Sequence, residues 1–248
     1  AGGLAGAQGD PFAVWLEDWR VESTSPDGHA VRLVARDGPL WLDLDLESRK
    51  PLVRHGDGGL SPKSDEPGNA SHYVGYTRLS TRGRLASEGR ELAVSGEAWF
   101  DHEWSTSALG PEAVGWDWFS LQLDDGRELM YFQIRREDGS IEAVSGGTLV
   151  DPDGATRRLA VRDLSLGVLA RWTSPETGAT YPARWRLRVP GEGLDLLVEP
   201  WVAGQEMRTS FVYWEGAVRV SGTREGQPVA GQGYVELTGY AGSMQGVF

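Results

Sequence analysis

The stretch 116-WDWFSLQLDDGRELMYFQIRREDG-139 decides the fold of this chain. Apolar and polar side chains alternate along 116–123 and again along 127–136, and a period of two residues is typical of a β-strand with one buried face. Asp124-Asp125-Gly126 separates the two runs, and Asp138-Gly139 follows the second. The stretch therefore predicts a β-hairpin followed by a further turn.

The same pattern extends outward in both directions. In 39-PLWLDLDLE-47 the leucines fall on one face and the acidic residues on the other, and 183–200 reads as another strand, turn and strand. No stretch keeps a 3.6-residue period with helix caps, so we expect almost no helix. Many short strands between glycine-rich turns are typical of an all-β sandwich or barrel.

Composition excludes several classes of function. The 248 residues carry a formal net charge of −12 without a local cluster of Lys and Arg, so we expect no nucleic-acid partner. No apolar run approaches the length of a membrane span, and we expect that the chain is not an integral membrane protein. The absence of cysteine excludes disulfides, thiolate nucleophiles and cysteine metal sites.

An internal repeat organises the chain. The segment 94-VSGEAWFDHEW-104 aligns with 229-VAGQGYVELTGY-240, which pairs Trp99 with Tyr234 and Asp101 with Glu236. We interpret this as two copies of one β module, residues 1–110 and 111–248. The first copy lacks a counterpart of the 116–139 hairpin, so we expect a module truncated at its N-terminus. Its open strand edges would then be covered by further strands upstream or by another element.

The segment 95-SGEAWFDHEWS-105 concentrates groups that could do chemistry. In a strand, Asp101 and Glu103 would share one face with Trp99, while His102 would share the other with Trp104. A carboxyl or imidazole group among aromatic rings can become an acid with a shifted pKa, as protonation of an alkene requires. The alternative is a structural corner between the two modules, which the match of Asp101 with Glu236 favours.

With these motifs the chain resembles the lipocalin-like superfamily of AttH-type proteins and carotenoid 1,2-hydratases (hydroxyneurosporene synthases). The resemblance depends on five segments: YVGYTRL (73–79), VSGEAWFDHEW (94–104), GWDWFSLQLDDGRELMYFQIR (115–135), YWEGAV (213–218) and GYVELTGY (233–240). It implies tandem lipocalin-like antiparallel β-barrels and a hydrophobic ligand such as an isoprenoid, a polyene or a lipid. Many such proteins are exported and some accompany ABC transporters, so it also implies a secreted or periplasmic protein of the cell envelope.

The resemblance also implies site residues. His102 and Trp104 match a His-x-Trp pair of the carotenoid hydratases, and Tyr131 and Gln133 fall on their Tyr-x-Asp pair, with an amide in place of the acid. An amide cannot protonate carbon, and Asp117 is the nearby carboxylate that could replace it.

The candidates form two groups. The catalytic candidates are His102, Trp104, Asp101, Asp117 and Tyr131. The ligand-binding candidates are Trp99, Glu103, Trp116, Trp118, Gln133, Tyr76, Arg78, Tyr213 and Glu215. We expect no cofactor and no metal, because the histidines are scattered without ligand spacing. Two functions stay open: a protein that binds a hydrophobic small molecule, and a hydratase or isomerase that protonates an isoprenoid C=C bond and adds water.

Overall fold

The structure is a computed structural model that describes residues 2–105, 109–110 and 112–246. Its described part contains two antiparallel β-sheets and no α-helix, as the sequence predicts. Two short 3₁₀ turns, η1 (Val161–Asp163) and η2 (Pro190–Glu192), interrupt the strands. Within this part of the chain, no helix has the length and apolar character needed to cross a membrane.

The first sheet has nine strands in the order β1-β2-β3-β4-β5-β8-β6, with β7 and β9 also pairing with β8. Its strands are β1 (Ala5–Gly9), β2 (Phe12–Leu16), β3 (Trp19–Ser23), β4 (Ala30–Asp37), β5 (Leu40–Ser48), β6 (Val53–Arg54), β7 (Leu60–Pro62), β8 (Ala70–Ser87) and β9 (Arg90–Ser105).

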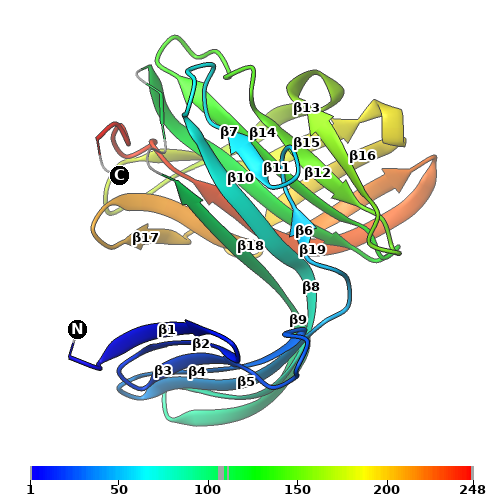
Figure 1. Cartoon of the computed structure of the whole chain (residues 1–248). Helices are drawn as coiled ribbons and strands as arrows, with labels where there is room; N and C mark the ends of the chain where they lie inside the picture. Colours follow the sequence, from blue (N-terminus) through cyan, green and yellow to red (C-terminus); the bar gives the residue numbers. More distant parts are fainter. Residues whose placement is uncertain (1, 106–108, 111, 247–248) are drawn as a thin grey trace. The chain divides into compact units, whose positions relative to one another are not determined.

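The second sheet has ten strands in the order β13-β12-β11-β10-β19-β18-β16-β15-β14, with β17 pairing with β18. Its strands are β10 (Ala113–Leu123), β11 (Glu128–Arg136), β12 (Gly146–Val150), β13 (Thr156–Ala160), β14 (Ser165–Thr173), β15 (Thr180–Val189), β16 (Leu194–Pro200), β17 (Glu206–Arg208), β18 (Val212–Arg224) and β19 (Gln227–Leu237). This sheet curls around its own core as a half-barrel (Figure 1). The hairpin predicted at 116–139 is β10–β11, and the one at 183–200 is β15–β16.

The chain forms two compact units, and each is described by itself. Unit 1 comprises 1–51 and 76–100, and unit 2 comprises 52–75 and 101–248. The long strands β8 and β9 therefore contribute residues to both units. Division of the chain at residue 110 stays a prediction of the sequence repeat.

Apolar side chains form a continuous row across unit 1. Neighbouring strands pair Ala7 with Val14, Val14 with Val21, Val21 with Leu33, and Leu33 with Leu44. Side chains directly opposite each other on adjacent strands contact one another, and such pairs stabilise a sheet. The leucines of 39–47 thus share one face, as predicted, and the acids between them lie on the other.

The hairpins β8–β9 and β18–β19, which carry the repeated segments, close with the same two-residue sequence. Glu88-Gly89 and Glu225-Gly226 both have positive φ at both residues, with φ of 52° and 74° in the first and 50° and 78° in the second. This is the backbone of a type I′ turn, whose twist matches that of the flanking strands. The shared turn agrees with the internal repeat.

The core of unit 2 lies on the concave side of the second sheet. Alternation along β10 directs Phe119, Leu121 and Leu123 into this core, where each is at most 1% exposed. Trp185 and Trp214 are also fully buried there. The even-numbered residues Trp116 and Trp118 point to the opposite, outer face of the sheet. Because the interior is tightly packed, the outer face is the candidate surface for binding a ligand.

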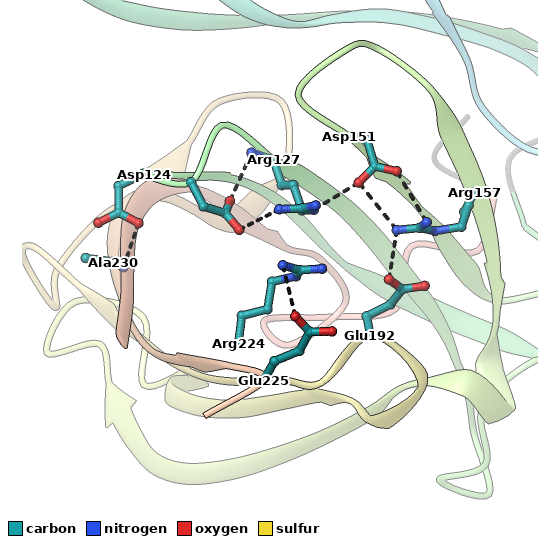
Figure 2. A network of polar contacts seen from close by, with 9 residues as sticks. Asp124, Arg127, Asp151, Arg157, Glu192, Arg224, Glu225 and Ala230 are labelled. Carbon is teal, nitrogen blue, oxygen red and sulfur yellow. Dashed lines mark hydrogen bonds and ion pairs between the residues drawn. The ribbon is translucent and has the colours of Figure 1, made fainter. Parts of the chain in front are cut away.

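A network of charged side chains connects the turns at one end of unit 2 (Figure 2). Arg127 donates hydrogen bonds of 2.9 Å to Asp125 and to Asp151. Asp151 also forms an ion pair of 3.3 Å with Arg157. Arg157 also binds Glu192 at 2.8 Å. The network links the β10–β11 turn to the β12–β13 turn and to η2.

We expect Asp151→Asn to lower the free energy of unfolding by about 1–2 kcal/mol, because it weakens two ion pairs at once, and the one with Arg127 is partly buried. Urea denaturation measures the change. Glu225→Gln is the matched control: Glu225 is 69% exposed and 3.6 Å from Arg224, and its loss should change stability by less than about 0.5 kcal/mol. Equal effects of the two substitutions would contradict this account of the network.

Candidate functional site

Three adjacent strands of unit 2 bring aromatic and acidic side chains together on the outer face of the second sheet. Trp118 of β10 pairs with Glu236 of β19, and Glu236 pairs with Glu215 of β18. Tyr213 precedes Glu215 by two residues and shares its face. Two carboxyl groups directly opposite each other on neighbouring strands destabilise a sheet, so the Glu215–Glu236 pair is not explained by folding.

Tyr73 of β8 joins this face to the end of β9. Its hydroxyl donates a hydrogen bond of 2.7 Å to Asp101 Oδ2 and accepts one of 2.8 Å from Trp118 Nε1. The side chain is buried, and burial together with the Asp101 carboxylate raises the pKa of the phenol well above its usual value. Tyr73 therefore stays protonated and fixes Asp101 and Trp118 relative to one another.

We refer to seven residues as the Tyr73–Glu236 cluster: Tyr73, Asp101, Glu103, Trp116, Trp118, Glu215 and Glu236. All seven belong to unit 2.

Glu236 is the unusual acid of the cluster. Its Oε1 accepts a hydrogen bond of 3.1 Å from Trp116 Nε1. Burial and the neighbouring Glu215 carboxylate, followed by Glu103 and Asp101, raise the pKa of Glu236 to about 7. Like charges and desolvation both disfavour the ionised form. Near neutral pH this carboxyl group is therefore partly protonated, as a general acid must be.

Glu103 is bound by Lys63, which follows β7, and by Ser71 of β8. Lys63 Nζ forms an ion pair with Glu103 Oε1, and the Ser71 hydroxyl donates a hydrogen bond to the same oxygen. The Lys63 ammonium also lies 4.6 Å from the ring centroid of Phe132. Lys63 thus neutralises the negative charge of Glu103.

His55 lies behind Tyr73, with 4.4 Å between the ring centroids. It is fully buried, and its Nδ1 lies 3.1 Å from the hydroxyl of Thr148 on β12. Burial, with the charge of Lys63, lowers the pKa of His55 to about 3, so its imidazole is neutral. Its Nε2 has no hydrogen-bond partner among the described residues.

The structure places five of the predicted site residues in this cluster: Asp101, Glu103, Trp116, Trp118 and Glu215. His102 and Trp104 lie on the other face of β9, as predicted from the alternation. There Trp104 is 49% exposed and stacks on His72, with 5.3 Å between centroids, and His102 packs edge-on at 4.8 Å. The predicted pair His102 and Trp104 is thus separated from Asp101 by the plane of the strand.

Asp117, Tyr131 and Gln133 lie together on the core side of β10 and β11. Asp117 is 2% exposed and accepts hydrogen bonds from Gln133 (2.8 Å), Arg135 (3.0 Å) and Tyr240 (3.0 Å). The Tyr131 hydroxyl lies 3.3 Å from Gln133 Oε1. Burial raises the pKa of Asp117, while its donors act in the opposite direction. The arrangement favours a structural role, and its use as an acid stays a prediction of the sequence.

Three predicted ligand-binding residues belong to unit 1: Tyr76, Arg78 and Trp99. Arg78 forms an ion pair of 2.6 Å with Glu97 of β9. The Tyr76 ring lies 6.4 Å from that of Phe100, and burial raises the pKa of its phenol. Their role in ligand binding stays a prediction.

Sequence reasoning missed Glu236, Tyr73, Lys63 and His55 as members of a site. The match of Asp101 with Glu236 in the repeat favours a structural corner and therefore does not single out Glu236 as a site residue. The signal that could have found it is an acid at an alternating position beside Tyr234, on the face that β19 shares with aromatic residues. No group of three or more His, Asp or Glu residues within 2–105, 109–110 and 112–246 is arranged to hold a metal ion.

Tyr73→Phe tests the role of this hydroxyl group. The substitution removes the hydrogen bonds to Asp101 and from Trp118, and we expect the free energy of unfolding to fall by about 2 kcal/mol. Denaturation followed by tryptophan fluorescence measures the loss. Tyr234→Phe, at a tyrosine that is 47% exposed, is the control with an expected change below about 0.5 kcal/mol. A Tyr73→Phe variant as stable as the wild type would show that the hydroxyl does not connect Asp101 of β9 with Trp118 of β10.

Comparisons with known proteins agree with this architecture. An AttH protein from Nitrosomonas europaea is 37% identical over 92% of this chain and 69% of its own, with a TM-score of 0.82. Kievitone hydratase from Nectria haematococca is 22% identical over 92% of this chain and 70% of its own, with a TM-score of 0.75. CghA, solved with Sch210972, is 15% identical over 96% of this chain and 74% of its own, with a TM-score of 0.61.

A comparison with curated proteins gives no match. The family model described as AttH-like matches residues 1–240, nearly the whole of the sequence. Together with the 37% identity to the Nitrosomonas europaea protein, this match confirms the resemblance that the sequence motifs indicate. The chain belongs to the AttH-like family and has its lipocalin-like fold.

Proposed function

We propose that this chain is a hydratase that binds a hydrophobic small molecule at the Tyr73–Glu236 cluster and protonates a C=C bond of that molecule. The observation that carries the proposal is Glu236: a carboxyl group that an indole N–H binds and that is partly protonated near neutral pH, because burial and then the surrounding carboxylates disfavour its ionised form. Protonation of carbon needs an acid of this kind.

The cluster contains the groups that each step requires. The Glu236 carboxyl transfers its proton to one alkene carbon, and the π electrons form the new C–H bond. The positive charge that develops on the other carbon would be stabilised by the electron-rich indole rings of Trp116 and Trp118, whose N–H groups bind Glu236 and Tyr73. Water then forms the C–O bond and gives its extra proton to the Glu236 carboxylate, which restores the acid. The net change is the addition of one water molecule.

The relatives support the same reaction class. Kievitone hydratase is named for a hydration, and CghA was solved together with a compound. Their identity to this chain is 22% and 15%, so they show its fold. The reaction and the ligand are what we propose for this chain.

The experiment is to incubate the purified protein with kievitone and with lycopene, an isoprenoid polyene, and to look by mass spectrometry for products heavier by one water molecule. We expect the wild-type protein to form such a product from one of them and Glu236→Gln to form none. Conversion by Glu236→Gln at the wild-type rate would overturn the role of Glu236.

Ligand binding without turnover is the second candidate function, a carrier of the cell envelope. The partly exposed aromatic side chains of the cluster favour it, since they offer apolar surface to a ligand whether or not a reaction follows. Native mass spectrometry of the protein with the same two compounds separates the candidates: a carrier binds them unchanged, and its Glu236→Gln variant binds them equally well.

Export and an ABC-transporter partner are part of the same proposal, from the resemblance alone. Fractionation of the producing cells tests it: we expect the protein outside the cytoplasm, and recovery in the cytoplasmic fraction alone would contradict export.

A further inference from the structure

Residues 52–75, which carry the short strands β6 and β7, lie against β10–β12 within unit 2 (Figure 1), and we call them the 52–75 segment. The Tyr73 hydroxyl accepts a hydrogen bond of 2.8 Å from Trp118 of β10, and Lys63 Nζ lies 4.6 Å from the ring centroid of Phe132 on β11. The segment therefore covers side chains beside the Tyr73–Glu236 cluster. Strands of two and three residues hold it to β8, and such short pairings open more readily than a core.

His55 is a fully buried histidine of this segment. Its Nδ1 lies 3.1 Å from the uncharged hydroxyl of Thr148 on β12, and its ring packs on that of Tyr73 with 4.4 Å between the centroids. Its Nε2 has no hydrogen-bond partner in the part of the chain that the structure describes. A protonated imidazole donates from both nitrogens, so protonation would leave a buried N–H of a cation without an acceptor. The closed segment therefore fits a neutral imidazole.

The charges around His55 also disfavour its protonation. The titratable groups that face it are the phenol of Tyr73 on β8 and the ammonium of Lys63, which follows β7. The carboxylates beyond them, on β9, bind these two groups: Asp101 accepts from the Tyr73 hydroxyl, and Glu103 forms its ion pair with Lys63. Burial and the Lys63 charge lower the pKa of His55 to about 3, whereas a histidine in water has a pKa of about 6.5.

From this geometry we propose that the 52–75 segment is an acid-sensitive cover: it opens away from β10–β12 as the pH falls below about 6, because the open segment lets the His55 imidazole take up a proton in water. Opening would break the hydrogen bond between Tyr73 and Trp118 and so uncover the Tyr73–Glu236 cluster. The device controls access to the cluster and goes beyond the proposed reaction.

The test is hydrogen exchange of the full chain at pH 5 and pH 7, followed by mass spectrometry, with each rate divided by the intrinsic rate at that pH. Backbone N–H groups that donate within the closed segment report its opening: those of His55, Asp57, Lys63 and Tyr73. The open state binds one more proton than the closed state between about pH 6.5 and pH 3, so the closed state loses stability as the pH falls through this range. We expect the opening equilibrium constant to be about 25-fold larger at pH 5 than at pH 7, with no such change in the β15–β16 hairpin.

His55→Asn is the diagnostic variant and His72→Asn its control. Asparagine keeps a polar group beside Thr148 but takes up no proton, so the response of the segment to pH should fall below about threefold. His72 lies in the same segment with an exposed side chain that stacks on Trp104, and its replacement should leave the 25-fold response unchanged, within about twofold.

A His55→Asn variant with the wild-type response would overturn this proposal. If the variant does not fold, the wild type decides alone: a change confined to the 52–75 segment supports the proposal, and an equal change in the β15–β16 hairpin, or none in the segment, contradicts it. Hydration does not enter this measurement. Failure to hydrate kievitone or lycopene, with the pH response of the segment intact, would therefore overturn the proposed function alone.

Discussion

Replacing Asp117 with alanine is expected to lower the free energy of unfolding by about 3–5 kcal/mol, because it leaves the Arg135 charge without its buried partner. Asp117 is 2% exposed, and Arg135 is 17% exposed, with its guanidinium 3.8 Å from the ring centroid of Tyr240. Arg135 also donates a hydrogen bond to the backbone oxygen of Thr238. The substitution therefore disturbs a point where β10, β11 and the end of β19 are joined.

Chemical denaturation measures this loss, with two controls. Asp117→Asn keeps an acceptor for Gln133 and should cost less than the alanine substitution. Asp43→Asn removes the exposed ion pair with Arg32, and we expect a change below about 1 kcal/mol. If Asp117→Ala were as stable as Asp43→Asn, the Asp117 network would not be structural, and its use as an acid would regain support.

Glu236→Gln should change both the pH dependence of stability and the reaction. The pKa of Glu236 is about 7 in the folded chain, against about 4.3 for an unperturbed glutamate. Between these pH values the folded state binds more protons than the unfolded state, so Glu236 makes the protein less stable as pH rises. Above about pH 7 its penalty is complete and is at most about 3.7 kcal/mol, at about 1.36 kcal/mol for each unit of pKa. Relative to Glu236→Gln, the wild-type protein should lose this amount between about pH 4 and pH 7.

The same substitution should reduce hydration by at least about 100-fold, since glutamine cannot donate a proton to carbon. Glu215→Gln separates the acid from its neighbour. It removes the carboxylate that contributes most, after burial, to the raised pKa of Glu236. We therefore expect the alkaline limb of the pH–rate profile to move to lower pH. If the free energies of unfolding of the wild type and of Glu236→Gln changed with pH in parallel, the raised pKa of Glu236 would be contradicted.

The strands could be predicted because they depend on local sequence. Alternation and the Asp124-Asp125-Gly126 turn locate the β10–β11 hairpin, and alternation alone assigns Asp101 and His102 to opposite faces of β9. Those features need only the next few residues along the chain. The AttH-like family was recognised for the same reason, because its motifs are contiguous.

The acid could not be predicted, because its chemistry arises from residues distant in sequence. Glu236 has a raised pKa only where β18 places Glu215 opposite it and where β9 brings Glu103 and Asp101 near. Conversely, Asp117 looked like an available acid, but the fold surrounds it with donors from β11 and from Tyr240. Pairing of distant strands decides which carboxyl group is free to react.

The most direct test of the central claim is the titration of Glu236 itself. Carbon-13 NMR of protein labelled at the glutamate side-chain carboxyl resolves each group, and Glu236→Gln identifies the resonance by its loss. We predict a resonance that titrates with a pKa of about 7 and moves to lower pH in Glu215→Gln. A Glu236 resonance that titrates near the ordinary value of about 4.3 would contradict its role as the acid.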